Sequence, residues 1–269
     1  MASIFDLGKD ASVIVTNIQH LSFSWYTFEM AQLSVNVNKF ALLRNSRGQN
    51  TPDVLAIARQ CIAAGVVGIT VHPRPDGRHI RRDDVTTLSP YLNDCGKEFN
   101  IEGYPSPDFV DMVCQVAPTQ VTLVPDPPEA LTSSFGWDLQ AHQVFLKDVI
   151  ERFRRHGIRT SIFVDPTLSD WQPLTWIMPD RVELFTYDYA HQFPQNPEGA
   201  IAPYRKAATV ISKLGIGLNA GHDLSLENLK FFVTQIPEIL EVSIGHALVC
   251  ESLQSGLGQI LSKYMDILR

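Results

Sequence analysis

The chain has 269 residues, 45% of them hydrophobic, enough to bury the core of one large α/β domain or two small ones. Its formal net charge of -7 argues against a general nucleic-acid binder, because such proteins need a net basic surface to displace counterions. The four cysteines are far apart and form no CxxC pair, which indicates neither a zinc knuckle nor a disulfide framework and favours a reducing cytoplasm.

The first thirty residues do not have the pattern of a signal peptide or a membrane span, because charged and polar residues interrupt their apolar stretch. A second methionine, Met30, directly precedes the first strand-like pattern. We therefore expect residues 1–29 to be an extension outside the barrel and residues 30–269 to form the catalytic domain. The alternative is an ordered N-terminal helix that packs on this domain.

The rest of the chain repeats one unit: a short β-branched run, a polar loop, and a helix-like segment that closes with Gly or Pro. We expect the strands to be apolar on both faces, as parallel strands covered by helices usually are. Eight such runs are predicted as strands, at residues 33–37, 66–71, 99–102, 120–124, 159–164, 181–185, 216–219 and 241–245.

The clearest predicted helix spans residues 51–65, where Thr51 can act as the N-cap, Pro52 suits the first helical position and Gly65 ends the helix. Segments 138–156, 198–214 and 246–268 are predicted as helices on the same pattern. Eight consecutive βα units predict an α/β fold, the (β/α)8 TIM barrel. The alternative, a doubly wound open sheet, usually has a GxGxxG turn after its first strand, and this chain has none there.

A barrel of this kind carries its catalytic groups where the strands end. Polar residues follow most of the predicted strands, as this fold requires: Asn36, Asn38, Lys39, His72, Glu102, Asp165, Glu183, Asn219, His222 and His246.

Two of these positions are glutamates next to apolar residues. Glu102 ends an apolar run, and a low-dielectric environment raises the pKa of a carboxyl group toward values suited to general acid/base catalysis. The alternative for Glu102 is a surface glutamate. Glu183 stabilises a cationic intermediate if its side of the strand lines the barrel; the alternative is a buried ion pair.

Other positions predict a phosphate site. Gly-His steps follow the last two strands, in NAGHDL (219–224) and SIGHAL (243–248), where glycine allows close backbone approach and barrels often hold phosphate. Guanidinium groups suited to phosphate come from Arg44, Arg47, Arg74 and Arg78. Arg81 and Arg82 are expected to be solvated.

A metal centre is a weaker interpretation of the same residues. His72, His222 and His246 come from separate strands and could together bind zinc. The chain has no HxH on its first strand and no HExxH, and the nearby arginines oppose a divalent cation. We therefore expect no metal site.

Seven segments together resemble the pyridoxine 5'-phosphate synthase family of bacterial vitamin B6 biosynthesis. They are SVNVNKFALLRNSRG, GITVHPRPDGRHI, FNIEG, VTLVPD, TSIFVD, GLNAGHDLS and VSIGHAL, and they extend from about Met30 to the C-terminus. The resemblance implies condensation of 1-deoxy-D-xylulose 5-phosphate with 3-amino-2-oxopropyl phosphate to pyridoxine 5'-phosphate, phosphate and water. It also implies no metal or organic cofactor, no nucleic-acid or membrane partner, and a homo-octamer.

The resemblance further implies a role for each site residue. His72 and Glu102 would act as general bases, His222 would donate a proton, and Glu183 would stabilise a transition state. The aminoketone phosphate would be held by Asn36, Arg47, Asp223, Gly245 and His246. The deoxyxylulose phosphate would be held by Asn38, Lys39, Arg74, His79 and Thr132.

The chain departs from the usual family pattern at three positions. Many members have Asn-Ile-Asp-His where this chain has Asn36-Val37-Asn38-Lys39, and a glycine often stands where Asp223 does. These changes indicate a subfamily variant. The competing hypotheses are a catalytically silent barrel that binds a phosphorylated sugar and a metal-dependent barrel hydrolase, but every proposed proton-transfer group is present, which favours the synthase.

Overall fold

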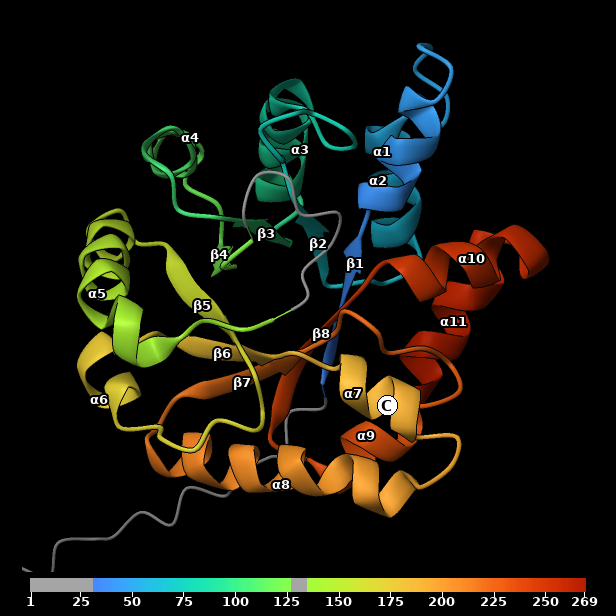
Figure 1. The fold of residues 1–269 in the computed structure, drawn as a ribbon. Coiled ribbons are helices and arrows are strands. Elements are labelled where there is room, and N and C mark those ends of the chain that lie inside the picture. The colour runs from blue at the N-terminus through green and yellow to red at the C-terminus, as the bar shows by residue number, and fades with distance from the viewer. Residues whose placement is uncertain (1–30, 127–134) are drawn as a thin grey trace, which may run out of the picture.

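The computed structural model describes residues 31–126 and 135–269. In this part of the chain, parallel strands pair in sequence order and close into a barrel when β1 pairs with β8 (Figure 1). The strands are β1 (Gln32–Asn36), β2 (Gly68–Val71), β3 (Glu98–Gly103), β4 (Gln120–Leu123), β5 (Arg159–Val164), β6 (Arg181–Leu184), β7 (Gly217–Ala220) and β8 (Ile239–Ile244). The predicted TIM barrel is confirmed, with strand limits within about two residues of those expected at most ends.

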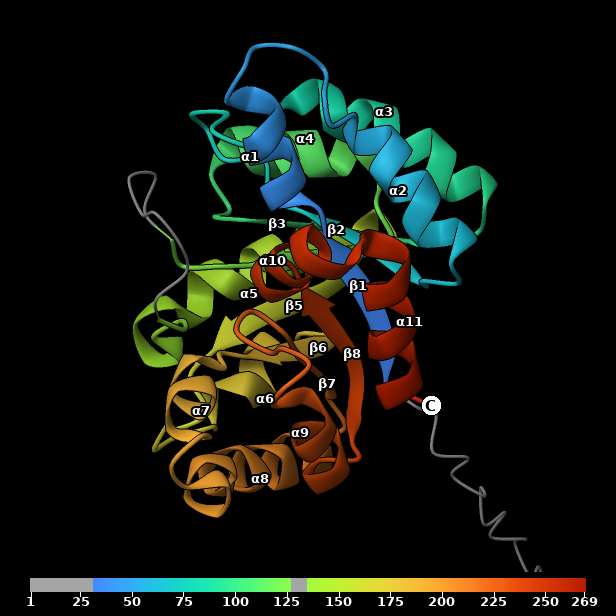
Figure 2. The same ribbon diagram turned by 90° about the vertical axis from the view of Figure 1, so that its right-hand side faces the viewer.

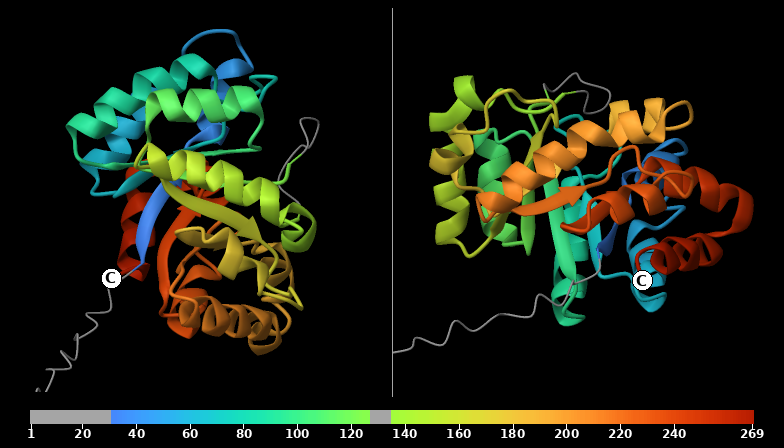
Figure 3. Two further views of the ribbon diagram at one scale, coloured as in Figure 1. Left: turned by 90° about the vertical axis from the view of Figure 1, so that its left-hand side faces the viewer. Right: turned by 90° about the horizontal axis from the view of Figure 1, so that it is seen from below.

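Helices surround the strands, and α10 and α11 lie over β1 and β8 (Figure 2). Two further views show β1 beside β8 and the helices outside them (Figure 3). The helices are α1 (Asn38–Asn45), α2 (Val54–Ala63), α3 (Arg82–Asp94), α4 (Pro107–Val116), α5 (Leu139–Arg155), α6 (Pro173–Ile177), α7 (Tyr187–Gln192), α8 (Pro197–Lys213), α9 (Leu229–Gln235), α10 (His246–Ser255) and α11 (Leu257–Ile267). No helix among the described residues is long and apolar enough to cross a membrane.

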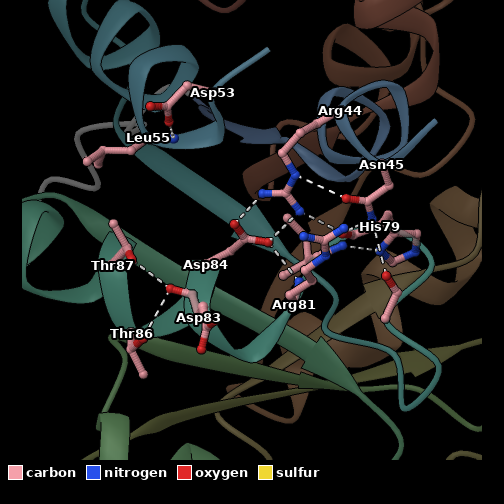
Figure 4. Close-up of polar contacts among 12 residues, drawn as sticks. Arg44, Asn45, Asp53, Leu55, His79, Arg81, Asp83, Asp84, Thr86 and Thr87 are labelled. Carbon is pink, nitrogen blue, oxygen red and sulfur yellow. Dashed lines mark hydrogen bonds and ion pairs between the residues drawn. The ribbon is translucent and has the colours of Figure 1, made fainter. Parts of the chain in front are cut away.

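Two predicted helices differ in their limits. Helix α2 begins at Val54 and not at Pro52, because the Asp53 carboxylate accepts hydrogen bonds from the backbone N–H groups of Leu55 and Ala56 (Figure 4). The predicted helix at 246–268 is two helices, α10 and α11. They separate at Gly256, whose φ of 84° cannot belong to a right-handed helix.

The expectation that the strands are apolar on both faces is wrong. Their outward side chains are apolar and pack against the helices, whereas TIM barrels usually also have bulky aliphatic residues inside. Here most inward positions are polar and buried: Ser34, Thr70, Asn100, Thr122, Ser161, Glu183, Asn219, Glu241 and Ser243. A separate apolar cluster of Val124, Phe163 and Phe185 lies at the carboxyl ends of β4, β5 and β6.

These inward side chains bond to one another across neighbouring strands. The Ser34 hydroxyl lies 2.7 Å from that of Thr70, and the Asn100 amide donates to Thr70 at 3.4 Å. Thr122 in turn donates to Asn100 at 3.1 Å. Hydrogen bonding of this kind offsets the cost of removing polar groups from water and holds neighbouring strands in register.

Ion pairs link the strands near their amino-terminal ends. Arg181 donates to the Glu241 carboxylate at 2.9 Å, and Arg159 donates to Glu98 at 2.7 Å. Glu241 is buried, so removing either arginine would leave a carboxyl group with less compensation inside the barrel.

The glycine of the first Gly-His step is required by the neighbouring strand. A β-carbon at Gly221 would lie 2.0 Å from the carbonyl oxygen of Ser243 in β8. We expect Gly221→Ala to reduce the free energy of unfolding by about 3 kcal/mol, because two strands would have to move apart. Denaturant unfolding measures this, with Gly258→Ala as the control, since a β-carbon there meets nothing within 4 Å. Equal stability of the two variants would contradict the prediction.

Candidate active site

A cavity of about 370 Å³ opens at the carboxyl ends of the strands. All four residues expected to act in catalysis line it: His72, Glu102, Glu183 and His222. The residues expected to hold substrate that line it are Asn36, Asn38, Lys39, Arg74, His79, Asp223, Gly245 and His246. The fold therefore brings together groups that are spread over more than 200 residues of the sequence.

Three other candidates do not line this cavity, and a fourth lies outside the described residues. Arg47 is exposed beyond the end of α1 and does not line this cavity, and Thr132 lies outside the described residues. Asp165 accepts hydrogen bonds from the backbone and hydroxyl of Thr167, which form a turn after β5. Asn219 is buried in the barrel, where its side-chain oxygen accepts from Arg181 at 3.1 Å.

His72 is a buried imidazole beside several cationic groups. Burial lowers its pKa well below the usual value, and the charges of Arg74 and Arg78 lower it further. Its Nδ1 lies 4.0 Å from Glu102 Oε2. An imidazole with so low a pKa is neutral near pH 7, and a neutral imidazole is the form that accepts a proton.

Glu102 is also removed from water. Burial raises its pKa to about 7, with the charge of His222 opposing the rise and that of Asp126 adding to it. The amide of Asn36 donates to Glu102 Oε2 at 3.3 Å. The raised pKa expected for this glutamate is thus found, and it places the proton affinity of Glu102 in the range in which a general base is most effective near neutrality.

His222 shows the opposite behaviour to His72. Burial by itself would lower its pKa, but the hydrogen bond and charge of Asp223 raise the value above the ordinary one. Nδ1 of His222 lies 2.8 Å from Asp223 Oδ2. This carboxylate stabilises the imidazolium, so the pair is suited to donating a proton.

Glu183 faces the cavity from β6 and is buried. Its pKa is well above the usual value because of burial, and the charges of Glu102 and Glu241 raise it further. Arg181, its near neighbour in sequence, is paired with Glu241. The environment of Glu183 therefore favours the protonated carboxyl group, which can donate a hydrogen bond to an oxygen in the cavity.

The cationic side of the cavity contains an ion pair that the sequence reasoning missed. Arg74 donates to Asp126 at 2.5 Å, and both side chains are buried. Asp126 lies just beyond β4, the predicted strand for which no polar end group was noted. Its place in "VTLVPD" after a strand was the available signal. Residues that line the cavity and were missed are Val124, Phe163, Ser243 and Ala247.

The structure corrects part of the phosphate prediction. Arg44 is buried and forms an ion pair with Asp84, so it is not available to a ligand (Figure 4). Arg78 pairs with Asp76 at 2.7 Å at the edge of the loop. Arg81 and Arg82 have exposed side chains, as expected.

Asn38, one of the departures from the usual family pattern, has a backbone partner. Its side-chain oxygen accepts a hydrogen bond from the N–H of His72 at 2.8 Å. An aspartate would present an equivalent oxygen, so the change from Asp to Asn leaves this contact possible.

The three imidazoles considered for zinc, those of His72, His222 and His246, all line the cavity. Within residues 31–126 and 135–269, no group of three or more His, Cys, Asp or Glu side chains is arranged to hold a metal ion.

Comparison with known proteins identifies the family. A family model described as "Pyridoxal phosphate biosynthesis protein PdxJ" matches residues 33–269. The chain belongs to the PdxJ family. Two PdxJ relatives named pyridoxine 5'-phosphate synthase, from Phocaeicola vulgatus and Bacteroides thetaiotaomicron, are 55% and 54% identical to it. Each match covers 89% of this chain and 100% of the relative.

Solved structures support the fold alone. An aldolase acting on 4-hydroxy-2-oxoglutarate and 2-dehydro-3-deoxyphosphogluconate matches this PdxJ chain with a TM-score of 0.59 and 15% identity, over 90% of this chain and 96% of its own. Tryptophan synthase from M. tuberculosis matches with a TM-score of 0.59 and 14% identity, over 90% and 93% of the two chains.

The raised pKa values of Glu102, as a base, and of His222, as an acid, predict a bell-shaped pH profile. We expect kcat/KM to rise with pH through about 7, as Glu102 loses its proton, and to fall on the alkaline side as His222 loses its own. Asp223→Asn should move the alkaline limb to lower pH, because it removes the charge that stabilises the imidazolium. Rates measured between about pH 5 and about pH 9 check this. An alkaline limb that does not move would contradict the assignment.

The buried carboxyl group also affects stability. The pKa of Glu102 rises from 4.5 to about 7 on folding, so the protein loses stability as pH increases between these values. Glu102→Gln should therefore unfold at higher denaturant concentration than wild type at about pH 8, because each tenfold rise in proton affinity on folding costs the ionised form roughly 1.4 kcal/mol. The difference should vanish below about pH 3, where Glu102 is largely protonated in both states. Glu227→Gln, at an exposed glutamate, is the control and should show no such pH dependence.

Proposed function

We propose that this chain is a pyridoxine 5'-phosphate synthase that condenses 1-deoxy-D-xylulose 5-phosphate with 3-amino-2-oxopropyl phosphate. The observation that carries the proposal is a single cavity in which two proton acceptors, His72 and Glu102, lie beside a proton donor, His222. The names of the PdxJ relatives support the same activity.

The reaction requires repeated proton transfers. The amine of one substrate attacks the ketone of the other and forms an imine with loss of water. Proton abstractions from carbon by His72 and Glu102 then allow inorganic phosphate to leave. His222 protonates a hydroxyl group that leaves as a second water, a carbon–carbon bond closes the ring, and a protonated Glu183 donates a hydrogen bond to an oxygen that gains negative charge.

Two regions of the cavity can bind phosphate. Lys39, Arg74 and His79 lie at one side, where we place the deoxyxylulose phosphate. Gly245 and His246 lie at the N-terminus of α10, where backbone N–H groups and the helix dipole favour the phosphate of the aminoketone. Asn36 and Asp223 complete this second region, and we propose that Arg47 and Thr132 contribute as the resemblance implies.

The proposal includes three statements about the chain as a whole. Residues 1–29 form an extension outside the catalytic barrel, which agrees with full-length relatives that align over 240 and 242 residues. The enzyme works in the cytoplasm without a metal or an organic cofactor. It assembles as a homo-octamer, for which light scattering is the direct measurement.

The purified chain, mixed with both substrates, should release phosphate and form pyridoxine 5'-phosphate, seen by its absorbance. His72→Asn and Glu102→Gln should each lower kcat by about 10²–10⁴-fold with little change in KM, because each removes a proton-transfer step and little binding. Asp165→Asn is the control, since this carboxylate follows a strand but lies outside the cavity.

Calorimetry distinguishes the competing hypothesis. A wild-type chain that binds the sugar phosphate but forms no product would be a silent barrel, and the synthase proposal would be wrong. Full turnover by either His72→Asn or Glu102→Gln would show that the proton-transfer roles are misassigned.

A further inference from the structure

The loop between β2 and α3 carries Arg74 and His79, and helix α1 holds it at both ends. At its start, Asn38 accepts a hydrogen bond from the backbone N–H of His72. At its far end, the last residue of α1, Asn45, contacts the loop backbone. Because Asn38 and Asn45 belong to one helix, the two ends of the loop are held at a spacing that this helix sets.

The contact at the far end is dense. Nδ2 of Asn45 lies 2.8 Å from the carbonyl oxygen of His79, which also accepts from Nη2 of Arg44 at 3.1 Å (Figure 4). The side-chain oxygen of Asn45 accepts from Nε of Arg44 at 3.1 Å, so the amide is held in one orientation. Asp84, at the start of α3, fixes the guanidinium of Arg44 in turn. Nδ2 of Asn45 also lies within 3.2 Å of the carbonyl oxygens of Gly77 and Arg78.

The backbone at this point determines which nitrogen of His79 carries the proton. The N–H of Ile80 donates to Nδ1 of His79 at 2.9 Å, so Nδ1 is an acceptor and the proton lies on Nε2. Burial and the charges of Arg74 and Lys39 lower the pKa of His79 to about 4, so the ring is neutral and has a single N–H. His79 lines the cavity, where that N–H can donate to an anion.

We propose that Asn45, oriented by Arg44, is a positioning residue that fixes the backbone at His79 so that the imidazole presents its Nε2–H to the phosphate of the sugar substrate. That this phosphate belongs to the sugar substrate rests on the proposed function. Asn45 does not line the cavity and acts through the carbonyl of His79.

Steady-state kinetics of Asn45→Ala in the full chain provide the first test. We expect the KM for 1-deoxy-D-xylulose 5-phosphate to rise about tenfold, as for the loss of one well-placed hydrogen bond to a charged group. The kcat and the KM for the aminoketone phosphate should stay within about twofold of wild type, because the other binding region is untouched. Asn93→Ala is the matched control, since Asn93 is an exposed asparagine in the last turn of α3.

Nuclear magnetic resonance of the ligand-free protein, with ¹⁵N-labelled histidine, provides a second test that needs no turnover. The signals of His79 are those that disappear in His79→Gln. Wild type should show an unprotonated Nδ1 and a protonated Nε2, whereas Asn45→Ala should show a mixture of the two tautomers. If the wild-type chain has no synthase activity, the proposed function is wrong. The tautomer of His79 still tests whether Asn45 positions it.

A purely structural role gives a different result. If Asn45→Ala lowers the thermal midpoint while the KM and the His79 signals match those of Asn93→Ala, the proposal is wrong. If Asn45→Ala does not fold, Asn45→Gln replaces it, because it keeps the amide on a longer side chain. Asn45→Gln should then raise the KM for 1-deoxy-D-xylulose 5-phosphate and show a mixture of the two His79 tautomers, and wild-type values of both would overturn the proposal.

Discussion

The interior of the barrel is lined with polar side chains that are removed from bulk water, and the rest of the molecule depends on how these groups are paired. In most barrels of this type aliphatic layers fill the interior. Here hydrogen bonds between neighbouring strands satisfy many inward groups. Two arginines form ion pairs with glutamates near the amino-terminal ends of the strands. The hydrophobic contribution to the free energy of folding then comes from the outer faces of the strands, which pack on the helices.

The glutamates inside the barrel do not all have an arginine partner. Glu241 lies beside Arg181, whereas Glu102 and Glu183 near the carboxyl ends have no comparable ion pair with an arginine among the described residues. Burial raises the pKa of all three carboxyl groups, that of Glu241 also to about 7, and only at Glu241 does an ion-paired arginine oppose the rise. The barrel keeps uncompensated carboxyl groups at the position where a reaction needs proton transfer.

Neighbouring groups give two histidines of the same cavity opposite properties. His72 lies among arginines and is held neutral, while His222 bonds to Asp223 and holds its proton more tightly. Departures from the usual family pattern fit this arrangement. Asp223 stands where a glycine is common and supplies a charge to His222, and Asn38 keeps the oxygen that bonds to the backbone of His72. At these two positions the variant residues contact His72 and His222 directly.

Sequence reasoning located the strands and the residues at their ends, because β-branched runs and turn residues act locally along the chain. It was wrong about side chains whose partners are distant in sequence. Arg44 looked like a phosphate ligand, but Asp84, forty positions later, binds it. Asp126 was overlooked, although it pairs with Arg74. The inward faces of the strands were expected to be apolar, although their serines, threonines and asparagines are visible in the sequence.

The sequence by itself determined the barrel, the order of its strands and the identity of the groups at its mouth, since alternation and strand length are local properties. Only the tertiary structure decided which of those groups carry a proton at neutral pH. Proton affinity depends on burial and on charges from other strands, and these exist only once the barrel has closed. The same holds for the loop between β2 and α3. The sequence predicts that Arg74 and His79 in this loop bind phosphate, but contacts from helix α1, which precedes the loop in the chain, hold its backbone.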